Sequence, residues 1–235
     1  MKRLRAEENA LEFLDRPNLD PSELRVCLRD VERLNRWFGG ADCVLQEVAR
    51  ISRAHGLAGD VHVLDVGSGG ADIPRALMRW GKRNDLRIHS VACDLHEQVS
   101  SVAAAFCNGE GSISILRADA LAPPFAPRSF DFVTCSLMIH HLTEDEVVRL
   151  LEAVRPLARH AVILCDLERS GLAYAGVWLA TRLICRSRLT WHDGPLSVRR
   201  AYTIPELAAL SRRAGCGDTH WSRRPFFRLV GVLEV

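Results

Sequence analysis

The hydrophobic positions at the start of the chain follow a helical period. Apolar residues recur three or four positions apart over residues 4–15 and again over 21–38, which predicts two helices. The pair Gly39-Gly40 ends the second helix, because glycine readily adopts the backbone conformation that closes a helix, and another helical segment follows it. Residues 1–57 are therefore expected to form a helical prefix, or lid, ahead of 58–235.

The remainder of the chain alternates short apolar runs with amphipathic segments. Apolar runs bounded by turn signals predict strands, and segments with a 3.6-residue period predict helices. The expected strands are 61–66, 86–93, 112–117, 130–137, 161–166, 219–221 and 226–235. The expected helices are 71–82, 96–107, 143–157 and 203–214. This alternation predicts an α/β fold with a doubly wound, mostly parallel seven-stranded sheet.

Residues 170–200 interrupt the alternation. An apolar, helix-like stretch over 171–185 is followed by an expected loop through 191–195, which contains glycine and proline. The stretch contains Tyr174 and Trp178, so its side chains suit an apolar or aromatic ligand, although plain core packing explains them equally well. Nearby arginines also allow such a helix to lie on a membrane surface.

The most informative segment, residues 63–74, reads Val-Leu-Asp-Val-Gly-Ser-Gly-Gly-Ala-Asp-Ile-Pro. An apolar strand brings Asp65 to its carboxyl end, and Gly67 and Gly69 allow a tight turn before the next helix. In open α/β sheets, ligands bind in the crevice beyond these strand ends. The third glycine of a dinucleotide fingerprint is missing, and Asp72 disfavours a pyrophosphate, so the turn suits a cationic ligand better.

This segment resembles the first motif of the Rossmann-like S-adenosylmethionine-dependent methyltransferases, (Asp/Glu)-x-Gly-x-Gly-x-Gly. Asp65, Gly67 and Gly69 match it, and Ala71 stands where the family has its last glycine. The resemblance implies S-adenosylmethionine as the cofactor and a methyltransferase core over 58–235, with 170–200 as a substrate cap.

Further acidic residues follow the second and third expected strands. Asp94 ends the second strand, where an acid accepts hydrogen bonds from ribose hydroxyls, although a helix cap is an alternative role. After the third strand, the resemblance implies that Asp119 and Ala120 contact the adenine. The cofactor-binding residues that we expect are Asp65, Gly67, Ser68, Gly69, Asp94, Leu95, Asp119, Ala120 and Ser136. Arg36 is a further candidate, as a partner for the methionine carboxylate or as a surface residue.

Two adjacent histidines, His140 and His141, follow the fourth strand beside the expected position of the methyl donor. Histidine accepts a proton near neutral pH, so both are candidate bases, although either one could instead cap or pack the next helix. His192, in the expected loop after the apolar stretch, is a second candidate. We expect no metal site.

Composition limits the remaining possibilities. The chain has 31 basic and 29 acidic residues, so its overall charge does not favour nucleic acid as a partner. Its eight cysteines lack metal-ligand spacing and lie partly in apolar runs, which predicts a reducing, cytoplasmic environment. We expect no signal peptide and no membrane-spanning helix. The late arginines leave peripheral contact with an anionic membrane open.

The segments Asn35-Arg36-Trp37, His140-His141 and 166–170 are similar to those of bacterial methyltransferases associated with type III polyketide synthases, and to quinone-pathway methyltransferases. This similarity implies O-methylation of a small aromatic or lipophilic hydroxylated molecule in secondary metabolism, with C-methylation as an alternative. Two other functions are weighed against it: a nicotinamide-binding oxidoreductase and a non-catalytic cofactor-binding module. The oligomeric state is not predicted.

Overall fold

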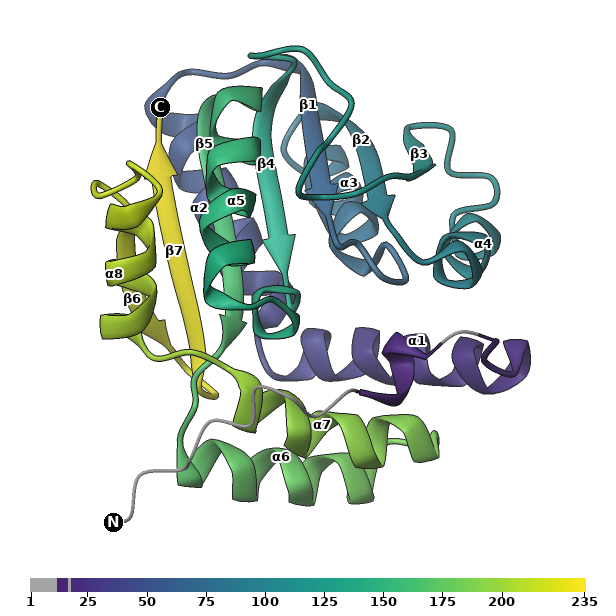
Figure 1. Cartoon of the computed structure of the whole chain (residues 1–235). Helices are drawn as coiled ribbons and strands as arrows, with labels where there is room; N and C mark the ends of the chain where they lie inside the picture. The colour runs from purple at the N-terminus through teal and green to yellow at the C-terminus, as the bar shows by residue number, and fades with distance from the viewer. Residues whose placement is uncertain (1–11, 17) are drawn as a thin grey trace.

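The computed structural model describes residues 12–16 and 18–235 (Figure 1). Most of the helix expected over 4–15 therefore lies outside the described residues, and its described end is a short 3-10 turn, η1 (Phe13–Asp15). The predicted helix over 21–38 is confirmed as α1 (Pro21–Trp37), whose first N–H groups are capped by the Asp20 carboxylate.

The seven strands form one sheet in the order β3-β2-β1-β4-β5-β7-β6. The first five are parallel, and β7 runs antiparallel to both of its neighbours. Their bounds are β1 (Gly59–Val66), β2 (Leu86–Asp94), β3 (Ile113–Arg117), β4 (Phe130–Ser136), β5 (Ala158–Leu167), β6 (His220–Arg224) and β7 (Arg228–Glu234). The predicted doubly wound, mostly parallel sheet is confirmed. The order in which successive strands are added to the sheet reverses between the parallel neighbours β1 and β4. The crevice expected for a ligand therefore lies beside the carboxyl ends of these two strands.

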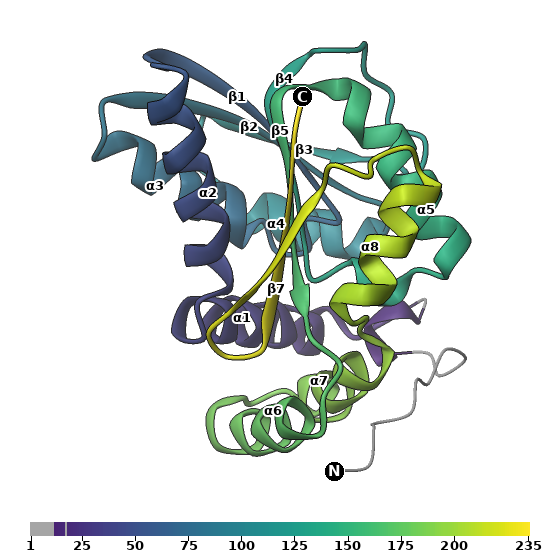
Figure 2. The same ribbon diagram turned by 90° about the vertical axis from the view of Figure 1, so that its left-hand side faces the viewer.

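Helices cover both faces of this sheet (Figure 2). On one face lie α2 (Gly40–Ala54) and α3 (Asp72–Lys82), and on the other α5 (Glu144–Val154) and α8 (Ile204–Arg213). A fifth helix, α4 (Glu97–Phe106), packs beside β2 and β3. The Thr143 hydroxyl and the Glu146 carboxylate form the predicted capping box at the start of α5, and a 3-10 turn, η3 (Arg155–Leu157), continues that helix.

The two helices of the expected prefix, α1 and α2, lie at different places in the fold. Helix α1 lies across the carboxyl-end edge of the sheet (Figure 1). Helix α2 instead packs on the sheet through Val44, Val48 and Ile51, all fully buried in the same apolar cluster as β1 and β5. Only α1 therefore lies over the strand ends, because the apolar face of α2 completes the layer that covers the sheet, and the role of α1 as a lid stays a prediction.

Residues 170–200 form a helical hairpin of α6 (Gly171–Ile184) and α7 (Arg188–Arg200). The loop expected through 191–195 is wrong, because these residues are helical and Pro195 lies inside α7. Gly194 allows close packing: a Cβ there would lie 2.7 Å from Cγ2 of Thr181 on α6. The glycine that suggested a loop is thus needed for contact between two helices, and tertiary packing overrides the local signal.

All eight cysteines are buried with free thiols, as expected for small core residues. Across the residues that the structure describes, no helix has both the length and the apolar character needed to cross a membrane.

Candidate active site

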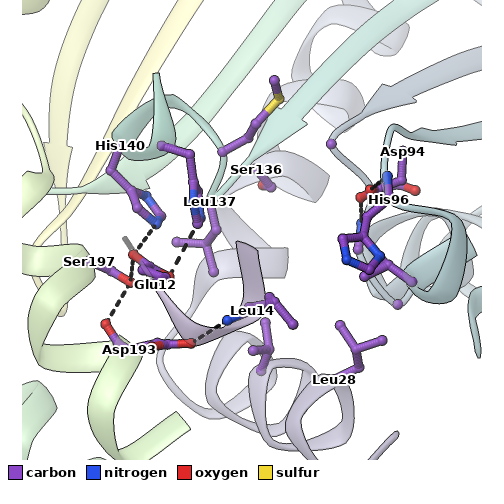
Figure 3. A pocket seen from close by; sticks show the side chains of 18 of the residues that line it. Glu12, Leu14, Leu28, Asp94, His96, Ser136, Leu137, His140, Asp193 and Ser197 are labelled. Carbon is purple, nitrogen blue, oxygen red and sulfur yellow. Dashed lines mark hydrogen bonds and ion pairs between the residues drawn. The ribbon is translucent and has the colours of Figure 1, made fainter. Parts of the chain in front are cut away.

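A cavity of about 1130 Å³ opens at the carboxyl ends of β1, β2, β3 and β4. The strand-end turns form one side of it, and α1, α6 and α7 contribute the other. Figure 3 shows Asp94 and His96 on one side of this cavity and Glu12 and His140 on the other. The cavity is therefore where the predicted crevice was expected, and helices from both ends of the chain enclose it.

The glycine turn after β1 lines the cavity through Gly67, Ser68 and Gly69. Gly67 has φ +62°, and a Cβ there would lie 2.5 Å from Sδ of Met138, so both its conformation and its surroundings require glycine. Ala71, where the resembling family has glycine, also has a left-handed φ of +56°. That conformation costs a residue with a Cβ about 1 kcal/mol, which explains the preference for glycine at this position.

Asp65 lies beneath this turn and does not line the cavity. Its side chain is fully buried, and the Thr134 hydroxyl donates a hydrogen bond to its Oδ1 at 2.5 Å. Burial raises the pKa of Asp65 to about 8, against the opposing effect of Thr134. Of the three aspartates expected to bind the cofactor, Asp94 and Asp119 line the cavity, whereas Asp65 is buried and does not.

Asp94 ties the end of β2 to the glycine turn. Its Oδ2 accepts the backbone N–H of Gly69 at 3.0 Å, and its Oδ1 accepts that of His96 at 2.9 Å. Burial raises the pKa of Asp94, and these two N–H groups oppose the rise. Each oxygen keeps a further lone pair for a ligand, so the structural role and the expected ribose contact are compatible.

The remaining predicted cofactor residues surround the same side of the cavity. Leu95, Asp119, Ala120 and Ser136 all line it. The hydroxyls of Ser68 and Ser136 are buried and have no hydrogen-bond partner among the described residues. Buried hydroxyls normally find a partner, so two such groups beside Asp94 fit a polar ligand that completes their hydrogen bonds. The donor and acceptor set at these strand ends fits a nucleoside with a cationic tail.

His140 and His141 lie in a 3-10 turn, η2 (Ile139–His141), that follows β4. His140 is buried, and its Nδ1 lies 2.7 Å from Oδ1 of Asp166 at the end of β5, whose Oδ2 accepts the backbone N–H of His140 at 3.1 Å. Burial acts to raise the pKa of Asp166, but His140 and these N–H groups hold that pKa below its ordinary value. Asp166 thereby fixes the ring, and the opposite ring edge, with Nε2, faces the Glu12 carboxylate.

Comparison with known proteins agrees with this geometry. The model of the family described as "Methyltransferase domain" matches residues 64–165. The structure is similar to a SAM-dependent methyltransferase from Aquifex aeolicus, with a TM-score of 0.63 and 17% identity, covering 93% of this chain and 100% of that one. No curated protein matches the chain.

Residues 64–165 thus match a methyltransferase domain, and the fold is that of the class I S-adenosylmethionine-dependent methyltransferases. S-adenosylmethionine is the cofactor of this class.

Two further solved structures share the methyltransferase fold. One is the magnesium protoporphyrin IX methyltransferase of Synechocystis PCC 6803 with bound SAH, with a TM-score of 0.54, 14% identity and 83% of both chains covered. The other is an O-methyltransferase family 2 protein from Planctomyces limnophilus in complex with apigenin, with a TM-score of 0.50 and 17% identity, covering 74% of this chain and 49% of that one. At these identities the likeness establishes the fold and leaves the acceptor of this methyltransferase undetermined.

Besides Asp65, two predicted site residues lie outside the cavity lining. Arg36 lines a second, smaller cavity of about 430 Å³ together with other arginines. The His192 side chain is 45% exposed, and its ring stacks on Phe13 with centroids 3.8 Å apart. Their sequence neighbours Asn35 and Asp193 line the main cavity instead. Arg36 and His192 thus lie outside the lining of the main cavity, whereas the residue next to each of them lines it.

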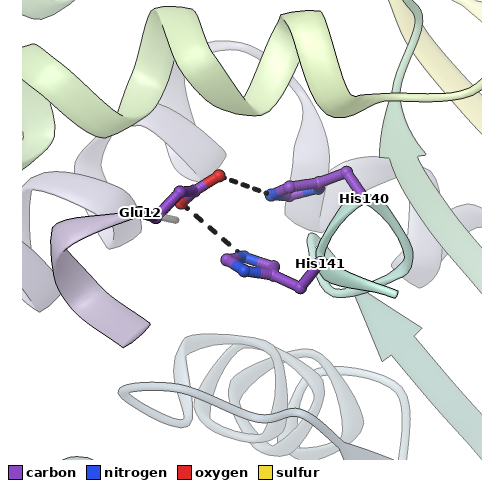
Figure 4. Close-up of side chains that lie close together, drawn as sticks. All are labelled: Glu12, His140 and His141. Carbon is purple, nitrogen blue, oxygen red and sulfur yellow. Dashed lines mark ion pairs between the residues drawn. The ribbon is translucent and has the colours of Figure 1, made fainter. Parts of the chain in front are cut away.

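Glu12 is one of the cavity residues that the sequence did not predict. Its carboxylate is buried between the two histidines, with Oε1 3.6 Å from Nε2 of His140 and Oε2 3.7 Å from Nε2 of His141 (Figure 4). The Ser197 hydroxyl on α7 donates to Oε1 at 2.8 Å. Nothing in the sequence around Glu12 indicated that it lies at the cavity. Glu12 meets the two histidines only because the chain before α1 packs against α7.

Proposed function

We propose that this methyltransferase methylates an oxygen of a small, lipophilic or aromatic hydroxylated molecule. The single observation that carries the proposal is an apolar chamber that ends at an oriented histidine. Leu28, Val31 and Leu34 of α1 and Val177 of α6 line the chamber, and His140, held by Asp166, lies at its polar end. Apolar walls with a few convergent polar groups are typical of small-molecule sites.

The two sides of the cavity have different tasks in this proposal. On the cofactor side, Gly67 and Gly69 let the backbone come close to the ligand, and Asp94, Ser68 and Ser136 offer it hydrogen bonds. When bound, S-adenosylmethionine supplies an electrophilic methyl group on a sulfonium. The opposite side holds the acceptor, so that the reacting atoms are aligned about 3 Å apart.

The histidines handle the acceptor's proton in this proposal. A hydroxyl is a weak nucleophile until it loses its proton, and a neutral imidazole accepts that proton near neutral pH. The chamber contains such a group at its polar end, which favours oxygen over carbon as the methylated atom. The origin of the acceptor in polyketide or quinone metabolism stays a prediction from the sequence resemblance.

Small-molecule acceptors fit what is known of this fold, since one solved neighbour is an O-methyltransferase family 2 protein in complex with apigenin. Helix α6 exposes the apolar side chains Leu172, Leu179 and Leu183. This face agrees with the expected peripheral contact with a membrane, through which a lipophilic acceptor could be delivered, and that contact stays a prediction.

Turnover tests the proposal. Wild-type protein is expected to bind S-adenosylhomocysteine but not NAD in calorimetry, and to methylate members of a library of phenols, detected by mass spectrometry. His140→Ala should lower kcat about 100-fold or more because the oriented proton acceptor is lost, while affinity for S-adenosylhomocysteine is unchanged. His89→Ala, which removes an exposed histidine paired with Asp60, is the matched control and should leave kcat unaltered.

Other outcomes would decide for the alternatives. Binding of NAD in place of S-adenosylhomocysteine would indicate the nicotinamide-dependent function. Binding of S-adenosylhomocysteine without methylation of any phenol would favour a non-catalytic module, and methylation at carbon would contradict the choice of oxygen.

A further inference from the structure

We infer that Glu12, His140 and His141 form a binding site for a divalent transition-metal ion at the acceptor end of the cavity. One atom from each side chain, a carboxylate oxygen and two imidazole nitrogens, lies within 4.8 Å of the others. All three residues line the cavity. Figure 4 shows each of the two rings directed toward its own oxygen of the Glu12 carboxylate.

The spacing of these atoms suits a shared ion better than hydrogen bonds. Protein N–H···O hydrogen bonds are about 2.7–3.2 Å long, and the Nε2–Oε distances of 3.6 and 3.7 Å exceed that range. Two ligand atoms about 2.1 Å from one ion are about 3.0–3.4 Å apart when the ion is tetrahedral or octahedral. The two Nε2–Oε distances are therefore only about 0.2–0.7 Å longer than those between ligands of one ion.

The hydrogen bonds of His140 leave its Nε2 free to bind a cation. The Asp166 carboxylate already accepts the backbone N–H groups of His140 and Leu167, so it accepts from Nδ1 as well, at 2.7 Å. With the proton on Nδ1, the Nε2 of neutral imidazole presents a lone pair to the lone pairs of Glu12. A metal cation between these two acceptors would satisfy both of them.

The surrounding residues supply the support that metal ligands normally have. A histidine ligand usually donates its other N–H to a carboxylate, which is the arrangement of His140 and Asp166. The Ser197 hydroxyl holds Oε1 of Glu12 at 2.8 Å. Glu12 is only 3% exposed, so its carboxylate is enclosed beside the two rings.

Two imidazoles with one carboxylate favour a borderline ion such as Zn²⁺, Co²⁺ or Fe²⁺ over Mg²⁺, which prefers oxygen ligands. The open side of the group faces the cavity. Resting on the proposed function, a hydroxyl of the acceptor would complete the shell there: its O–H bond breaks, the oxygen stays on the ion, and the proton passes to solvent water. A bound ion lowers the pKa of such a hydroxyl. In the metal-loaded protein the ion therefore takes over the task that the proposed function gives to the proton acceptor, and His140→Ala lowers kcat through the loss of a ligand.

Metal binding can be measured without a methyl donor or an acceptor. Apoprotein is titrated with Zn²⁺, Co²⁺ and Mg²⁺ in calorimetry, and the metal content after dialysis is determined by mass spectrometry. We expect one Zn²⁺ or Co²⁺ per chain and no stoichiometric Mg²⁺. Glu12→Gln and His141→Ala should each weaken Zn²⁺ binding about 100-fold, and Asp166→Asn, a positioning residue, about 10–100-fold. His89→Ala should bind as the wild type does.

The visible spectrum of the Co²⁺-loaded wild type provides a readout that depends on no variant, because nitrogen and oxygen ligands in a protein shell give absorption unlike that of Co²⁺ in water. Absence of stoichiometric Zn²⁺ and Co²⁺, or equal Zn²⁺ affinity in Glu12→Gln and wild type, would overturn the metal site. If no metal binds and a chelator does not affect methylation, the metal site is overturned while the proposed function stands. Metal binding without methylation of any acceptor would support the metal site and contradict the proposed function.

Discussion

The two sides of the cavity are built in different ways. The cofactor side comes from turns that directly follow β1, β2, β3 and β4, and each contributes residues adjacent to a strand end. The acceptor side is assembled from α1, α6, α7 and the segment around Glu12, which are distant in the sequence. The sheet fixes the first set, whereas helix packing brings the second set together. The fold alone can thus place the residues of the cofactor side, whereas the residues of the acceptor side depend on how the helices of this chain pack.

The largest expected effect concerns Asp65, which supports the cofactor side from below. Its pKa of about 8 in the folded protein exceeds its ordinary value of 3.8, so the folded state binds an extra proton between these pH values. The free energy of unfolding of the cofactor-free protein should therefore fall as pH rises from about 4 to about 8, by up to about 1.4 kcal/mol per pH unit from this group.

Asp65→Asn tests this, because it keeps the size of the side chain and an acceptor for Thr134 but cannot ionise. Urea unfolding of both proteins across this pH window gives the measurement. The difference in unfolding free energy between variant and wild type should grow with pH, which also separates Asp65 from the other buried carboxyls. Parallel curves would show that Asp65 ionises in the folded protein as it does in water.

The sequence predicts the cofactor side of the cavity better than the acceptor side. Strand ends are fixed by two local signals, an apolar run and a following turn, so Asp94 and Asp119 could be placed at one edge of the sheet. Helix faces are harder, because adjacent residues point about 100° apart around a helix and only packing decides which one faces the cavity. Asn35 was missed in favour of Arg36 for this reason. Glu12 had no local signal at all.

A smaller effect is expected from Asp94, on the rim itself. Asp94→Ala removes the acceptor for the Gly69 N–H and the proposed partner of the ribose hydroxyls. Affinity for S-adenosylhomocysteine should fall by roughly 1.5–3 kcal/mol, about 10–150-fold, as for lost hydrogen bonds to a charged group. Calorimetry measures it, and circular dichroism checks that the variant is folded. Unchanged affinity would remove Asp94 from the cofactor side.

The smallest effect is expected at Arg36, where the sequence and the structure disagree. Its side chain lines the second cavity with Arg29, Arg33 and Arg75, so it is not placed to pair with a ligand carboxylate in the main cavity. Arg36→Ala should therefore leave affinity for S-adenosylhomocysteine unchanged in calorimetry. Asn35→Ala is the matched comparison, because Asn35 donates to Asp72 at 2.9 Å and accepts from Arg228 at 3.1 Å beside the cofactor turn. A loss of affinity in Arg36→Ala but not in Asn35→Ala would mean that α1 turns its other side to the cavity when the cofactor binds.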